Sequence, residues 1–114
     1  MQITGRKREK KLRAAVAVSA MVEDIVGCKW SLSVLKLIRD GIIRPGAMQR
    51  AVPGLSTKVL NERLRKLLRY GIVEKRVFAE VPPRVEYRLT KYGRKFDALI
   101  ENIGTLQDWV PQRR

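Results

Sequence analysis

The chain has 114 residues, enough for one domain with a modest core, and its hydrophobic content of 45% is typical of a globular protein and argues against disorder. Twenty-five Lys and Arg face eleven Asp and Glu, and this net charge of +14 favours a polyanionic partner, nucleic acid first and an anionic membrane surface second. The absence of histidine and the single Cys28 argue against a zinc or copper site, a disulfide framework and the usual general-base catalysis, so no enzyme activity, metal or cofactor is expected.

Helical spacing predicts two helices in the first third of the chain. Residues 1–9 are polar and basic and are expected to form a flexible arm. From Lys10 to about Val26 apolar residues recur at helical intervals, until Gly27 interrupts them. A second helix is predicted from about residue 29 to residue 39, and Gly41 suits the left-handed position that follows a helix.

The middle of the chain predicts two helices joined by a tight turn. Pro45 suits the first turn of a short third helix that reaches about Val52. The pair Pro53–Gly54 is a turn signal, Ser56 is the predicted N-cap of a fourth helix, and Gly71 ends that helix. The predicted buried stripe of the fourth helix consists of Leu60, Leu64, Leu67 and Leu68.

The periodicity then changes to that of strands. Residues 73–78 and 84–89 are predicted strands, and Pro82–Pro83 gives a stiff turn that keeps the loop tip from extending the ladder. A last helix is predicted from Thr90 to about Trp109.

The order of these elements predicts the fold. Three packed helices followed by a two-stranded hairpin form a winged helix-turn-helix, so the expected class is mainly α with a small β-hairpin. The domain is expected over residues 10–110, including extra terminal helices for dimerisation, with a tail at 111–114. The longest apolar run is shorter than the about 20 residues of a membrane span, so we expect no membrane partner and a cytoplasmic, nucleoid-associated location.

The start of the fourth helix carries residues suited to reading DNA. With its leucines turned inward, Thr57, Lys58 and Asn61 face outward; Thr57 and Asn61 can pair with base edges, and Lys58 with guanine or phosphate. Arg65 and Arg69 lie one and two turns further on and are phosphate candidates. A merely solvated helix face has the same pattern, so this alternative stays open.

Charge around this helix favours the DNA interpretation. No acidic residue occurs between Gly41 and Asn61, and the hairpin adds four basic residues, with Arg84 directly after the proline pair. Such a wing can follow the backbone or enter a minor groove, although an arginine there can also simply protect an edge strand from aggregation. The predicted DNA contacts are Arg44, Ser56, Thr57, Lys58, Asn61, Arg65, Arg69, Arg76 and Arg84.

Three segments resemble the HxlR-type transcription regulators. Residues 22–30, VEDIVGCKW, look like the family's GGKW signature; residues 53–60, PGLSTKVL, resemble the start of its recognition helix; and residues 82–90, PPRVEYRLT, resemble its wing. The resemblance covers roughly residues 20–110. It implies a homodimeric winged-helix repressor or activator whose first and last helices form the dimer contact.

The apolar side of the last helix supports this dimer. Trp109 and Val110 extend it beyond what one such domain can cover, and an exposed stripe usually marks an interface, although the same residues could close the monomer's own core. The predicted interface comprises Leu12, Val16, Phe96, Leu99, Ile100, Ile103, Leu106 and Trp109.

Cys28 takes the place of the second glycine of the GGKW signature. Family members that sense oxidants carry their cysteine earlier, at a position that falls near Ala17, where this chain has no thiol. Cys28 is therefore a candidate sensor, which the neighbouring Lys29 could activate, or a small inert residue between two helices. The sequence names no effector.

The sequence as a whole predicts a dimeric, sequence-specific regulator that binds a pseudo-palindromic site on double-stranded DNA. The alternative is an architectural protein that binds DNA without sequence preference. An RNA-binding protein is disfavoured because aromatic residues make up only 6% of the chain and none forms an evident stacking platform.

Overall fold

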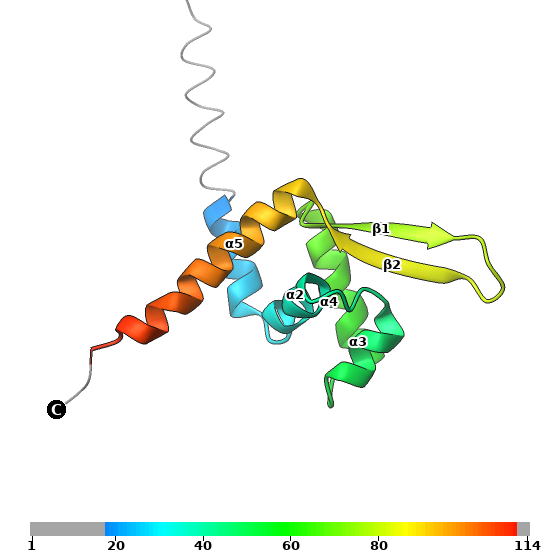
Figure 1. Ribbon diagram of the computed structural model, residues 1–114, viewed down its shortest axis with the longest axis horizontal. Coiled ribbons are helices and arrows are strands. Elements are labelled where there is room, and N and C mark those ends of the chain that lie inside the picture. Colours follow the sequence, from blue (N-terminus) through cyan, green and yellow to red (C-terminus); the bar gives the residue numbers. More distant parts are fainter. Residues whose placement is uncertain (1–17, 112–114) are drawn as a thin grey trace, which may run out of the picture.

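The computed structural model describes residues 18–111, so the expected arm, Leu12 and Val16 lie outside the described residues. A helical body carries a two-stranded hairpin on one side, and the last helix leaves the body toward the other side (Figure 1). Four helices, a hairpin and a further helix follow one another as predicted. The predicted class, mainly α with a small hairpin, is confirmed.

The first two helices enter the core from either side of a tight turn. The first is helical over residues 18–27 and buries Met21 and Ile25. The second, α2 (Ser31–Arg39), begins two residues later than predicted. Trp30, its N-cap, has a φ of 75°, and this left-handed backbone cannot continue a right-handed helix.

The predicted pair of helices around a tight turn is present as α3 (Pro45–Ala51) and α4 (Thr57–Arg69). Pro45 takes the first helical position of α3. Gly54 has a φ of 89°, which lets the chain reverse between the two helices. Ser56 caps α4 as predicted, since its Oγ accepts a hydrogen bond from the backbone N–H three residues on, at 3.2 Å.

The hairpin has the predicted bounds. β1 (Val73–Phe78) and β2 (Arg84–Leu89) are antiparallel, with the first residue of β1 opposite the last residue of β2. The backbone N–H of Tyr87 donates to the carbonyl of Ile43 at 2.8 Å. This bond attaches the hairpin to the segment that leads into α3.

The last helix, α5 (Lys91–Thr105), starts at its N-cap Thr90, whose Oγ1 accepts from the Gly93 N–H at 2.9 Å and donates to the Gly71 carbonyl at 2.6 Å. The sequence predicts one helix as far as about residue 109. The α-helix instead stops four residues earlier, and a 3₁₀ turn, η1 (Leu106–Trp109), follows. Because every residue from 101 to 111 is exposed, no packing holds the α-helical geometry there.

An ion-pair cluster fixes α5 to α2. Arg39 Nε lies 3.0 and 2.9 Å from the two carboxylate oxygens of Asp97, and Arg39 Nη1 lies 3.0 Å from Glu101 Oε1. Asp97 is buried, so this cluster sets the direction in which α5 leaves the body.

The core lies between the helix at residues 18–27, α2, α3, α4, the first half of α5 and the base of the hairpin. Of the predicted stripe of α4, only Leu68 is not fully buried. The largest fully buried apolar side chains are those of Ile25, Val34, Leu35, Met48, Leu60, Leu64, Leu67 and Ile72.

Candidate nucleic-acid interface

The outer side of the first turns of α4 carries the residues predicted to read bases. Thr57, Lys58 and Asn61 are all exposed, while the leucines of the same helix point into the core. Gln49 Nε2, from α3, donates to Thr57 Oγ1 at 2.8 Å. Because the Thr57 oxygen accepts this bond, its hydroxyl hydrogen is available to another acceptor. Sequence reasoning missed Gln49, whose position depends on how α3 packs against α4.

The arginines further along α4 have different environments. Arg65 and Arg69 are exposed, as expected for phosphate contacts. Arg63 is half buried instead, and its Nε donates to the Lys29 carbonyl at 2.8 Å. Arg63 therefore fastens α4 to the turn before α2.

The sequence suggests an arginine that extends freely from the wing, but Arg84 makes contacts within the wing instead. Its guanidinium carbon lies 4.0 Å from the centre of the Phe78 ring, its Nη2 lies 3.4 Å from Glu80 Oε1, and its Nε lies 3.7 Å from Glu86 Oε2. These contacts leave 31% of the side chain exposed. Arg76, on the other strand, is exposed and pairs with a glutamate of its own strand at 3.1 Å.

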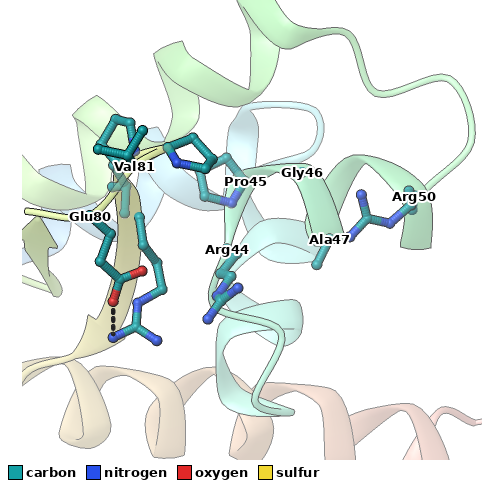
Figure 2. Close-up of a pocket in the computed structure, with 11 residues that line it drawn as sticks. Arg44, Pro45, Gly46, Ala47, Arg50, Glu80 and Val81 are labelled. Atoms are coloured by element: carbon teal, nitrogen blue, oxygen red, sulfur yellow. Dashed lines mark ion pairs between the residues drawn. The ribbon is translucent and has the colours of Figure 1, made fainter. Parts of the chain in front are cut away.

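An open groove of ≈ 480 Å³ separates the wing from the start of α3. Figure 2 shows Arg44 and Arg50 on the α3 side of this groove and Glu80 and Val81 on the wing side. Arg84 completes the lining, so three arginines and one acidic residue surround the groove. It lies between α3 and the predicted wing, and most of the charged side chains that line it are positive.

A second polar cluster connects the first helix to the far end of α4. Lys66 Nζ lies 2.8 Å from Asp24 Oδ1, and the Tyr70 hydroxyl donates to Asp24 Oδ2 at 2.6 Å. The hydrogen bonds from Lys66 and then Tyr70 lower the pKa of the Asp24 carboxyl. The bond to Asp24 raises the pKa of the Lys66 ammonium in turn.

Cys28 lies at the edge of this cluster and is half buried. The sequence points to Lys29 as the neighbouring cation, but the Lys29 ammonium lies over the ring of the next residue, 5.1 Å from its centre. Lys66 takes the place beside the thiol instead, with its Nζ 2.8 Å from Cys28 Sγ. The two residues are 38 positions apart in the chain, so sequence reasoning could not predict this contact.

The residues predicted for the dimer interface divide into two groups. Phe96 is only 4% exposed and belongs to the core of the single chain, so the monomer accounts for it and we leave it out of the interface. Ile100 is half buried, and Trp109 is 81% exposed. The other exposed apolar residues on this side are Leu99, Ile103, Leu106 and Val110.

The described part of the chain holds neither a membrane-spanning helix nor a metal-binding cluster. None of the helices there is long and apolar enough to cross a membrane. Within residues 18–111, no group of three His, Cys, Asp or Glu side chains is arranged to hold a metal ion.

Packed helices, a tight turn before α4 and a hairpin after it define a winged helix-turn-helix, the architecture of a large class of DNA-binding transcription regulators. Residues 25–114 match the model of the HxlR-like helix-turn-helix family, and the chain belongs to this family. The HTH-type transcriptional regulator sll1512 of Synechocystis is 42% identical over 92 residues, which cover 80% of this chain and 68% of that protein.

Solved structures give the same result. The reduced form of the transcriptional regulator YodB from B. subtilis superposes with a TM-score of 0.68 at 30% identity, over 76% of this chain and 85% of that one. The redox regulator HypR in its reduced form gives 0.70 at 30% identity, over 79% and 89%. The chain is thus a transcriptional regulator of the HTH type and not an enzyme, which confirms the predicted family, fold and lack of catalysis.

Proposed function

We propose that the chain is a sequence-specific regulator that reads a major groove with the outer side of α4. The observation that carries this proposal is the exposure of Thr57, Lys58 and Asn61 together at the start of a capped helix. Arg65 and Arg69, further along the same helix, contact phosphates. The basic groove lies between the wing and α3, and α3 contacts the start of α4 through the bond from Gln49 to Thr57, so the groove extends the basic surface along the duplex.

Two copies of the chain bind together, through the exposed apolar side of α5 and η1. A tryptophan with 81% of its surface exposed is costly to leave in water, and Ile103 and Leu106 continue the same exposed apolar surface. A two-fold pair of this kind presents its two α4 helices to successive major grooves, about 34 Å apart on one face of the duplex. The pairing accounts for the apolar residues at the end of α5 and in η1 that the single chain leaves exposed.

The test compares two variants of α4 on a selected duplex and on a scrambled one. Selection from a random DNA pool first yields the preferred site, which should be a pseudo-palindrome. Asn61→Ala should weaken binding to the selected duplex by about 1–3 kcal/mol and leave binding to the scrambled duplex nearly unchanged. Arg65→Ala should weaken both equally and reduce the salt dependence of binding, because it removes a phosphate contact.

A flat affinity across the random pool would instead establish the architectural alternative, a protein that binds duplex DNA without sequence preference. Equal losses for Asn61→Ala on the two duplexes would remove the base-reading role of that residue.

A second candidate function, thiol-based switching at Cys28, is supported by the Lys66 ammonium beside the sulfur. Hydrogen peroxide converts a thiol to a sulfenic acid with loss of water, and this change would disturb the contact between the first helix and α4. Peroxide should weaken DNA binding by the wild type but not by Cys28→Ser. Equal responses of the two proteins would eliminate the thiol as the switch.

A further inference from the structure

We propose that the groove between α3 and the wing binds one backbone phosphate of the duplex, and that two glutamates act on this site in opposite directions. Buried Glu86 positions Arg44 and Arg84 for the phosphate, whereas exposed Glu80 competes with the phosphate for Arg84. The inference rests on the proposed DNA binding and adds to it a phosphate site, a positioning residue and an internal competitor.

Glu86 lies at the centre of three arginines from different places in the fold. Its side chain is only 9% exposed. Its Oε1 accepts from Arg88 Nη2 at 3.1 Å, while its Oε2 faces Arg44 Nε at 3.9 Å and Arg84 Nε at 3.7 Å. Arg44 precedes α3 and Arg84 begins β2, so a single carboxylate oxygen brings together the two sides of the groove.

These contacts leave the two guanidinium groups able to bind an anion. A guanidinium has five N–H donors, and neither Arg44 Nε nor Arg84 Nε lies within hydrogen-bond distance of Glu86. Because Arg84 Nε is buried without a partner, an anion in the groove would meet the terminal Nη groups of this arginine. Arg44 keeps 55% of its side chain exposed and Arg84 keeps 31%. Two arginines that face one carboxylate can together bind the oxygens of a phosphate, and the open groove admits a group on the outside of a duplex.

Glu80 has a different relation to Arg84. It lies in the wing loop with 52% of its side chain exposed, and its Oε1 is 3.4 Å from Arg84 Nη2 (Figure 2). A solvent-exposed pair of this kind is weak and easily exchanged for a stronger one. A phosphate entering the groove takes the place of the Glu80 carboxylate, which then remains close to a like charge.

The experiment measures the affinity of the full-length chain for duplex DNA as a function of salt. Glu80→Gln should bind about threefold more tightly, because a competing charge is lost. Glu86→Gln should bind about tenfold more weakly although it also removes a negative charge, because two arginines lose their orientation. Glu74→Gln is the control for the loss of one negative charge on the same hairpin: Glu74 pairs with Arg76, itself a predicted DNA contact, so this variant should bind slightly more tightly, but Glu74 does not line the groove.

A double-mutant cycle separates positioning from a general structural effect. Arg84→Ala should cost about tenfold in the wild type and less than about twofold when Glu86 is already Gln, because the arginine is then no longer placed. An unchanged cost of Arg84→Ala, or a tighter Glu86→Gln that matches the Glu74→Gln control, overturns the inference. Thermal melts identify any variant that fails to fold.

If Glu86→Gln does not fold, Arg44→Ala and Arg84→Ala provide the second measurement. A shared phosphate predicts that the double variant lowers the salt slope by about 0.9, and two separate phosphates would lower it by about 1.8 and refute the shared site. Failure of the wild type to bind duplex DNA would instead contradict the proposed function itself.

Discussion

Gly93 offers the sharpest test of how α5 is attached to the winged unit. A Cβ built on Gly93 would lie 2.8 Å from the carbonyl carbon of Ile72 and closer still to its oxygen, whereas ordinary contacts begin at 3.4 Å. In Gly93→Ala, α5 must therefore move away from the backbone it covers. This movement breaks two hydrogen bonds of Thr90, from its N–H to the Ile72 carbonyl at 3.0 Å and from its hydroxyl to the Gly71 carbonyl at 2.6 Å.

The expected loss follows from these contacts. Two hydrogen bonds at about 1 kcal/mol each and overpacking at about 1–3 kcal/mol outweigh the better helix propensity of alanine. The free energy of unfolding should fall by about 3 kcal/mol, and the melting temperature by roughly 15 °C. Urea and thermal denaturation followed by far-UV circular dichroism measure both quantities.

Gly104, in the last turn of the same helix, is the matched control. Nothing lies within 4 Å of a Cβ built there, so Gly104→Ala should stabilise the protein by about 0.5–1 kcal/mol. A Gly93→Ala protein as stable as the wild type would show that the helix does not rest on the Ile72 backbone, and the reasoning would be refuted.

Four further predictions concern the cap, the ion pairs and the exposed helix. Ser56→Ala should lower the free energy of unfolding by about 1 kcal/mol in urea denaturation, because it removes the N-cap bond of α4. An unchanged midpoint would show that the cap does not stabilise the protein. Asp97→Ala should cost about 2 kcal/mol by the same assay because it removes the buried carboxylate and leaves the partly buried Arg39 with only the exposed Glu101; a loss no larger than for an exposed pair would contradict this. The stabilisation from Asp24, whose pKa is lowered in the folded state, should be complete above its ordinary pKa of 3.8 and be lost as the pH falls through the folded value. Acid titrations of the wild type and Asp24→Asn check this, and identical profiles would exclude the effect. Trp109→Ser should weaken self-association in sedimentation equilibrium, and an unaltered dissociation constant would place the interface elsewhere.

Local signals in the sequence account for most of the fold. Ser56 and Gly54 specify the start of α4 through a side-chain cap and a positive φ, and neither depends on distant residues. The proline pair after residue 81 similarly restricts the hairpin loop, so both strands could be given their bounds in advance. Trp30 is the counterexample, because a bulky side chain in the left-handed region goes against local preference and is tolerated only through its surroundings.

The candidate site was less predictable than the fold, because its geometry depends on residues far apart in the chain. The exposure of Thr57 and Asn61 followed from the leucine stripe, since helical periodicity fixes which side faces out. The orientation of Arg84 did not follow, because it is set by Glu86 and an aromatic ring on the opposite strand. The bond from Gln49 to Thr57 was equally hidden, since no local pattern marks it. Which of these residues touch DNA stays a prediction.

The bond from the Tyr87 amide to the Ile43 carbonyl attaches the wing to the body of the protein. The reach of the wing tip can therefore change without a change in this attachment. Because the hairpin is anchored at its base, loops of different length between β1 and β2 can alter how far the tip reaches along a duplex. The contacts of Arg44 and Arg84 with Glu86 would be kept, since none of these three residues lies in the loop between the two strands. On the proposed mode of binding, a change in loop length would therefore alter the reach of the wing tip while both arginines stay beside Glu86.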